Sequence, residues 1–122
     1  MAKKVLIIED EPDILKMIDF VLKKNNFTVI SATDGPQGLD LFSQQSPDLV
    51  ILDWLLPSMD ALDVSEKIRN ASGQKPVPII LLTATAEDVP QKAKDCGASA
   101  YFLKPFDYKE LVAKIKELIG NG

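Results

Sequence analysis

Side chains that could bind a metal ion or a phosphate group follow four of the short apolar runs in this sequence, directly where each run ends. They are two acids after the first run, one acid after the third, a threonine after the fourth and a lysine after the fifth: Glu9, Asp10, Asp53, Thr83 and Lys104. Two carboxylates about 4 Å apart repel each other by about 4 kcal/mol at an effective dielectric constant of about 20. A fold that gathers three acids therefore needs positive charge beside them. The lysine supplies one charge, and a divalent cation would supply two more.

The types of ligand in this set indicate which cation that would be. The sequence has no histidine and one cysteine, so oxygen ligands favour Mg²⁺, Mn²⁺ or Ca²⁺ over zinc. Magnesium typically takes one or two carboxylates, keeps several waters and bridges a phosphate. Asp10 and Asp53 suit that role, together with a backbone carbonyl just after Asp53, which leaves Thr83 and Lys104 to hold phosphoryl oxygens. An aspartate can itself attack phosphorus, and Asp53 is the predicted acceptor.

Five short apolar runs predict the strands that must position these residues. They cover residues 5–8, 27–30, 49–52, 79–82 and 101–103. The first, third and fourth are continuous rather than alternating, which is typical of parallel strands buried on both faces. Amphipathic stretches separate the runs, and residues 111–119 carry the clearest helical stripe. Right-handed crossovers then give a parallel sheet with helices on both faces, which binds ligands at the carboxyl ends of its strands.

Composition limits the remaining possibilities. The 122 residues predict one domain, 1–122, and the net charge of −4 argues against nucleic-acid or anionic-membrane partners. No signal peptide or membrane span is predicted, so the cytosol is the expected compartment. Glu11 and Asp13 are interpreted as acids that start a helix. The lysines of the last two predicted helices, Lys92 among them, are interpreted first as a solvated face and second as a surface that docks a partner.

Four motifs in order resemble the receiver domain of two-component response regulators, over Lys4 to Ile119. They are VLIIEDE at 5–11, LDWLLPSMD at 52–60, LTA at 82–84 and KPF at 104–106. The resemblance implies an α/β, flavodoxin-like, doubly wound fold of a single domain, with strand order 2-1-3-4-5. It also implies that the chain is a phosphoacceptor rather than an enzyme, and that it is similar to single-domain chemotaxis regulators. A partner's phosphohistidine would donate the phosphoryl group to Asp53 in a Mg²⁺-dependent reaction.

The same resemblance assigns the metal ligands. Asp10, Asp53 and the backbone carbonyl of Leu55 would bind Mg²⁺ directly, and Glu9 would act through a water molecule. Mn²⁺ could replace Mg²⁺. Ala61 stands where the family usually has glycine, and an alanine would be strained there if the position needs a positive φ.

The resemblance also assigns the phosphoryl contacts and the switch. Thr83, the backbone amide of Ala84 and Lys104 would hold the phosphoryl oxygens. Thr83 would move together with Tyr101, and the peptide bond between Lys104 and Pro105 would be cis. The surface of the fourth helix, fifth strand and fifth helix would then change and recruit a downstream protein target. The expected phosphodonor is a sensor histidine kinase or a histidine phosphotransfer protein, and the chain would be a monomer or a phosphorylation-dependent dimer.

Three other functions remain to be weighed against this one. A flavin-binding electron carrier would need a small, polar phosphate loop after the first strand, but residues 10–13 are acidic and contain a proline. A P-loop nucleotide enzyme would need a glycine-rich stretch ending in Gly-Lys-Ser/Thr, which the sequence lacks. A degenerate receiver that only binds other proteins is disfavoured because all five site residues are present.

Overall fold

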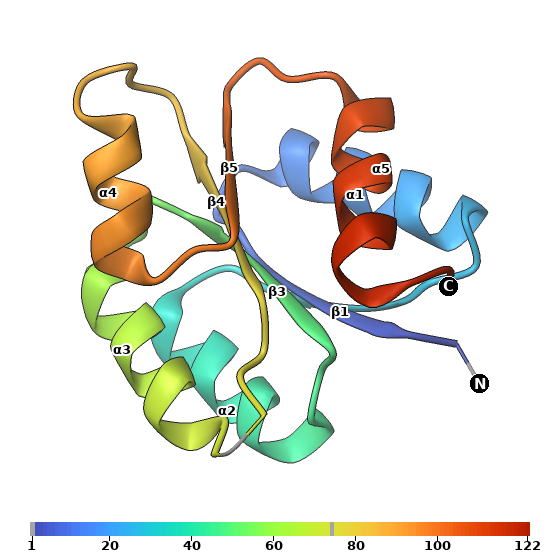
Figure 1. Cartoon of the computed structure of the whole chain (residues 1–122), viewed down its shortest axis with the longest axis horizontal. Helices are drawn as coiled ribbons and strands as arrows, with labels where there is room; N and C mark the ends of the chain where they lie inside the picture. The colour runs from blue at the N-terminus through green and yellow to red at the C-terminus, as the bar shows by residue number, and fades with distance from the viewer. Residues whose placement is uncertain (1, 74) are drawn as a thin grey trace.

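Five strands and five helices alternate along the chain in the computed structural model, which describes residues 2–73 and 75–122. The strands are β1 (Lys4–Ile8), β2 (Thr28–Ala32), β3 (Leu49–Asp53), β4 (Ile79–Thr83) and β5 (Ala100–Leu103). The helices are α1 (Pro12–Lys24), α2 (Gly35–Gln45), α3 (Ala61–Ala71), α4 (Val89–Cys96) and α5 (Tyr108–Ile119). All strand pairs are parallel, in the order β2-β1-β3-β4-β5 (Figure 1). This confirms the predicted flavodoxin-like fold and its strand order.

The sheet separates two hydrophobic cores, because successive side chains of a strand point to opposite faces. On β1, Val5 and Ile7 pack with α1 and α5, whereas Leu6 and Ile8 pack with α2 and α3. Figure 1 shows α1 and α5 on one side of the sheet and α2, α3 and α4 on the other. The four strand residues are fully buried, which is why the run is apolar at every position.

Each strand differs slightly from its predicted bounds: β1 begins one residue earlier, and β3 and β4 each end one residue later. The second strand begins at Thr28 rather than at Phe27, and it continues to Ala32. Phe27 is buried among residues of α1 and the sheet but precedes the strand, so its apolar character reflects packing rather than strand pairing. The fifth strand begins at Ala100, one residue before the predicted run.

The condition under which Ala61 would be strained is not met. Ala61 is the first residue of α3 and is not among the positive-φ residues of the described chain. The left-handed backbone of this loop lies instead at Ser58, with a φ of 73°. Alanine therefore carries no backbone strain at the start of α3, and it is buried there against the α2–α3 side of the sheet.

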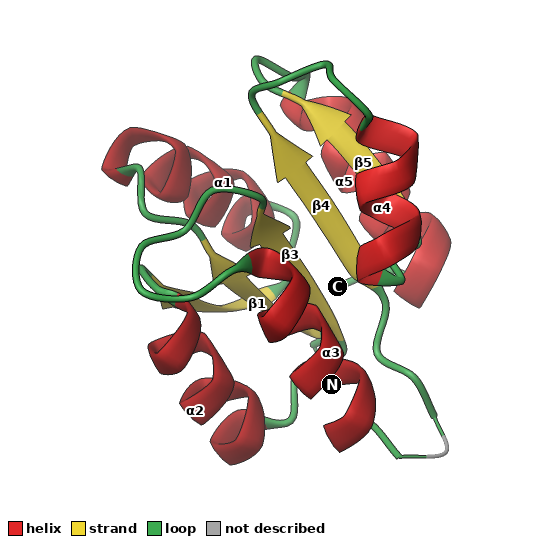
Figure 2. Cartoon of the chain, turned by 90° about the vertical axis from the view of Figure 1, so that its left-hand side faces the viewer, coloured by secondary structure: helices red, strands yellow, loops and turns green. Residues whose placement is uncertain are grey.

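Helix α4 lies beside the last two strands (Figure 2). It begins without a side-chain cap. Its N-cap residue, Asp88, has a left-handed backbone with a φ of 52°, and its carboxylate makes no capping hydrogen bond. The other end is regular, since Gly97 ends the helix with a φ of 66°, as glycine does at this position. Cys96 is fully buried against Leu81 of β4, as expected for a core residue.

Candidate functional site

The order of the strands brings the predicted site residues to one edge of the sheet. Asp53 is the last residue of β3 and pairs in register with Leu82 of β4. Backbone pairing continues past the strand ends, because the Trp54 N–H donates to the Leu82 carbonyl at 2.7 Å. In the same way, the Lys104 N–H donates to the Thr83 carbonyl at 2.8 Å. The main chain of the loops is thus fixed where the functional side chains begin.

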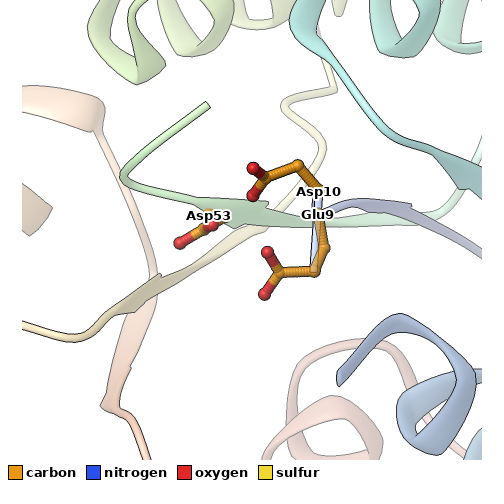
Figure 3. A group of neighbouring side chains, drawn as sticks. All are labelled: Glu9, Asp10 and Asp53. Atoms are coloured by element: carbon orange, nitrogen blue, oxygen red, sulfur yellow. The ribbon is translucent and has the colours of Figure 1, made fainter. Parts of the chain in front are cut away.

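Three carboxylates converge at this edge. One oxygen from each of Glu9, Asp10 and Asp53 lies within 4.8 Å of the others. Figure 3 shows these side chains facing a common space where β1 and β3 end. Glu9 is 0% and Asp53 is 3% exposed, whereas Asp10 is open to solvent. Oxygen ligands of this kind, two of them withdrawn from water, suit a hard divalent cation such as Mg²⁺.

Lys104 is the counter-ion of this cluster. Its Nζ lies 2.7 Å from Glu9 Oε1, 3.2 Å from Asp53 Oδ1 and 3.1 Å from Glu11 Oε1. The lysine side chain is only 9% exposed, so its charge is poorly screened by water. The contact with Glu9 Oε1 is an ion pair without hydrogen-bond alignment, which leaves that buried oxygen without a hydrogen-bond donor among the described residues. An oxygen in this state has capacity for a further positive ligand.

Glu11 has a role that the sequence did not reveal. It occupies the N-cap position of α1, as expected, but its side chain makes no capping hydrogen bond. The carboxylate instead reaches Lys104, from the opposite end of the sequence. The Glu-Asp-Glu run of the first motif was the available signal, since every second residue of an extended segment points to the same side.

Charge and burial together shift the pKa values of Asp53 and Lys104. Burial raises the pKa of Asp53, and the adjacent Glu9 carboxylate raises it further, to about 8, although Lys104 acts in the opposite direction. Burial lowers the pKa of the Lys104 ammonium, but its close contacts with Glu9 and Glu11 and the charge of Asp53 outweigh burial and raise that pKa overall. Without a metal ion, the site therefore favours a neutral Asp53 and a charged lysine.

Thr83 is buried and faces the β4–α4 loop. Its hydroxyl oxygen accepts a hydrogen bond from the Thr85 N–H at 3.2 Å and lies 3.4 Å from Thr85 Oγ1. Lys92 of α4 joins this group, because its Nζ donates to Thr85 Oγ1 at 2.8 Å. The same ammonium lies 5.1 Å from the centre of the Trp54 ring. Lys92 is thus partly exposed, as expected of a solvated helix face, but its ammonium also contacts the loops after β3 and β4.

The remaining predicted residues surround this edge with different degrees of exposure. The Lys104–Pro105 peptide bond is cis, as the resemblance implied. Ala84 follows β4 and is exposed. Leu55 is 61% exposed in the loop after Asp53, and Tyr101 is 44% exposed on β5. The apolar side chain of Leu55 thus lies at the surface.

Comparison with known proteins gives the family. The family model described as "Response regulator receiver domain" matches residues 5–116, which is nearly the whole chain. The chain belongs to the response regulator receiver domain family. Receiver domains are phosphoacceptors that work with histidine kinases or phosphotransfer proteins, so a general phosphoacceptor role follows for this chain. The flavin carrier and the P-loop enzyme are no longer alternatives for this receiver domain.

Individual relatives agree with this assignment. The receiver domain is 35% identical over 120 residues to the phosphate regulon transcriptional regulatory protein PhoB of Escherichia coli (strain K12), with 98% of the chain and 52% of PhoB covered. It thus spans about half the length of the curated relatives it matches.

Solved receiver structures match over nearly their full length. The chemotaxis response regulator CheY4 of Vibrio cholerae superimposes with a TM-score of 0.88 at 27% identity, over 97% of this chain and 99% of CheY4. The receiver domain of the sensor histidine kinase PA1611 of Pseudomonas aeruginosa PAO1 gives a TM-score of 0.86 at 29% identity, over 99% and 100% of the two chains. That structure has a magnesium ion coordinated in its active site cleft. Across residues 2–73 and 75–122 of the present chain, the helices are too short or too polar to cross a membrane.

Proposed function

We propose that Asp53 accepts a phosphoryl group from the phosphohistidine of a sensor histidine kinase or a histidine phosphotransfer protein. One carboxylate oxygen of Asp53 would attack phosphorus, and the new O–P bond would form as the P–N bond breaks. The electron pair of that bond would stay on the imidazole nitrogen, which would take a proton from solvent. The observation that carries this proposal is the position of Asp53, buried at the end of β3, 3.2 Å from Lys104 and within 4.8 Å of two further acids.

The acids would hold the divalent cation that the reaction requires. Asp10, Asp53 and the backbone carbonyl of Leu55 would bind Mg²⁺ or Mn²⁺ directly, with Glu9 acting through water. The three converging carboxylates and the buried Glu9 oxygen that lacks a hydrogen-bond donor support this arrangement. A bound cation supplies positive charge that favours ionised Asp53 and neutralises the incoming phosphoryl oxygens.

The protein would hold the transferred group through three further contacts. Lys104, the Thr83 hydroxyl and the backbone amide of Ala84 would each bind a phosphoryl oxygen, which is positioning and charge stabilisation without a general base. Lys104 supports this because its side chain is only 9% exposed and its ammonium already contacts Asp53. Removing that charge-assisted contact should therefore impair acceptance strongly.

The signal would leave through the surface formed by α4, β5 and α5. Thr83 would turn toward the phosphoryl group, Tyr101 would change its position with it, and a downstream protein would recognise the altered surface. Tyr101 and Leu103 support this because both are large and markedly exposed on β5. We place this activity in the cytoplasm, in a monomer or a phosphorylation-dependent dimer, and regard the chain as a phosphoacceptor that assists its own phosphorylation rather than as an enzyme.

The test is intact-mass measurement after incubation with a small acyl-phosphate donor, with and without Mg²⁺. We expect one phosphoryl adduct that requires both Mg²⁺ and Asp53. Asp53→Asn removes the acceptor, and Asp40→Asn is the matched control because Asp40 is an exposed acid on α2. An adduct on Asp53→Asn would place the acceptor elsewhere. The absence of any adduct on the wild-type protein would favour a degenerate receiver that only binds other proteins.

A further inference from the structure

Lys92 connects the two loops that flank the acceptor site. From the middle of α4, its ammonium donates to Thr85 Oγ1 at 2.8 Å and lies 5.1 Å from the centre of the Trp54 ring. Trp54 directly follows Asp53, and Thr85 is two residues after Thr83. One cation on α4 is therefore in contact with the loop after β3 and with the loop after β4.

This contact continues to the Thr83 hydroxyl. Because Lys92 supplies a hydrogen to Thr85 Oγ1, the hydrogen of that hydroxyl is left free to point at Thr83 Oγ1, 3.4 Å away. The Thr85 N–H also donates to Thr83 Oγ1 at 3.2 Å, and the Thr83 hydroxyl can donate to the Thr85 carbonyl at 3.4 Å. Within the described chain, the hydrogen-bond partners of the Thr83 hydroxyl all belong to Thr85.

We infer that Lys92 is a positioning residue, which holds the Thr83 hydroxyl on Thr85 while the acceptor is free. This inference rests on the proposed function, in which Thr83 turns to bind a phosphoryl oxygen. The turn requires Thr83 to leave Thr85, and Lys92 opposes it by donating to Thr85 Oγ1 from its position over the Trp54 ring. Lys92 thus favours the unphosphorylated arrangement of the β4–α4 loop.

The side-chain contacts of Lys92 matter more because the first turn of α4 is weakly stabilised. Asp88 at the N-cap has a left-handed backbone and offers no side-chain hydrogen bond, so the first turn lacks the usual stabilisation of a helix start. The Lys92 N–H donates to the Asp88 carbonyl at 2.8 Å in that same turn. The side-chain contacts of Lys92 therefore hold a turn that capping leaves weak, and Figure 2 shows this turn next to the loop that follows β4.

Linkage predicts the size of the effect. A contact that exists only in the unphosphorylated arrangement shifts the equilibrium between the two arrangements toward it by some factor. The affinity for a ligand that binds only the other arrangement falls by the same factor. A cation over an exposed aromatic ring contributes a factor of about two to five in an equilibrium constant at room temperature. Removing the Lys92 contacts should therefore raise the affinity for a phosphoryl mimic by about two- to fivefold.

The experiment is a calorimetric titration of the full chain with fluoroberyllate, a tetrahedral anion that mimics a phosphoryl group, in saturating Mg²⁺. Lys92→Met removes the donor and the charge, Lys92→Arg keeps both, and Lys94→Met is the matched control on the same helix. We expect about two- to fivefold tighter binding for Lys92→Met, and wild-type binding for Lys92→Arg and Lys94→Met. Acrylamide should also quench the fluorescence of Trp54, the single tryptophan, more strongly in Lys92→Met than in Lys94→Met.

Each other outcome overturns a defined part of the argument. Unchanged or weaker binding by Lys92→Met, while the wild type binds, would overturn the role of Lys92 and leave the proposed function intact. Equally tight binding by Lys92→Met and Lys94→Met would show a general charge effect and would also overturn that role. A wild-type protein that binds no fluoroberyllate with Mg²⁺ would overturn the proposed function, and this inference with it.

Discussion

Replacing Asp53 with asparagine should stabilise the metal-free protein, although it removes the proposed acceptor. At an effective dielectric constant of about 20, Glu9 within 4.8 Å repels ionised Asp53 by about 3.5 kcal/mol. Asp10 adds a smaller repulsion because it is exposed to solvent. Lys104 at 3.2 Å attracts Asp53 by about 5 kcal/mol on the same scale. These charge interactions nearly cancel, so the burial of the Asp53 carboxylate decides the sign.

The raised pKa of Asp53 sets the upper limit of the gain. With a pKa of about 8 in the folded protein against 3.8 in the unfolded chain, Asp53 at pH 7 lowers the free energy of unfolding by at most about 4 kcal/mol. Burying the asparagine amide also costs free energy, so we expect Asp53→Asn to raise the free energy of unfolding by about 2 kcal/mol. For a domain of this size, that gain corresponds to a rise in Tm of about 6 to 10 °C.

The assay is thermal unfolding followed by far-ultraviolet circular dichroism in a chelating buffer at about pH 7. Asp53→Asn should melt at a higher temperature than the wild type, and the control Asp40→Asn should melt at the same temperature as the wild type. Added Mg²⁺ should raise the wild-type Tm and narrow the difference, because a ligand that binds only the folded state stabilises it. An Asp53→Asn protein that melts at or below the wild type without metal would refute the claim that ionised Asp53 is a net cost to the fold.

Further predictions concern pH, the counter-ion and packing. In chelating buffer, the wild-type Tm should fall as pH rises from about 4 to about 8, because the folded state retains the Asp53 proton that the unfolded state has lost; Asp53→Asn should show a flatter profile in the same melts. Lys104→Met should lower the metal-free free energy of unfolding by about 3 to 5 kcal/mol in urea titrations, since the fully buried Glu9 carboxylate loses its counter-ion, and an unchanged midpoint would contradict this. Gly38→Ala should cost about 1 to 3 kcal/mol in the same titrations, because the new Cβ would lie 2.5 Å from Ile8 Cδ1. Burial raises the pKa of the Cys96 thiol, so intact-mass measurement should find it unalkylated in the native protein and alkylated in denaturant; rapid native alkylation would argue against a buried thiol.

The position of the site backbone could be predicted from the sequence, because the carboxyl ends of parallel strands lie at one edge of the sheet. Continuous apolar runs marked β1, β3 and β4, and the residue after each run located Glu9, Asp53 and Thr83 without any side-chain information. The strand order needed the resemblance to the receiver family, since periodicity does not say which strands are neighbours. Strand bounds were less certain, because Phe27 is apolar for packing and not for strand pairing.

Contacts between long side chains could not be predicted from the sequence in the same way. Glu11 lies at the cap of α1 and Lys92 lies on α4, and the side chain of each reaches a loop residue outside its own helix. Their rotamers decide which partner they reach, and loop geometry decides which partners are within range. Loop backbone was equally hidden from the sequence, since the left-handed residue before α3 is Ser58 and not Ala61.

The separation of the core into two faces has a consequence for how this domain tolerates sequence change. Val5 and Ile7 touch one set of helices, and Leu6 and Ile8 touch another, with the sheet backbone between them. Substitutions on opposite faces share no partners, so their effects on the free energy of unfolding should add, whereas neighbours on one face should couple. Each face can therefore drift in sequence, or be redesigned, without matching changes on the other.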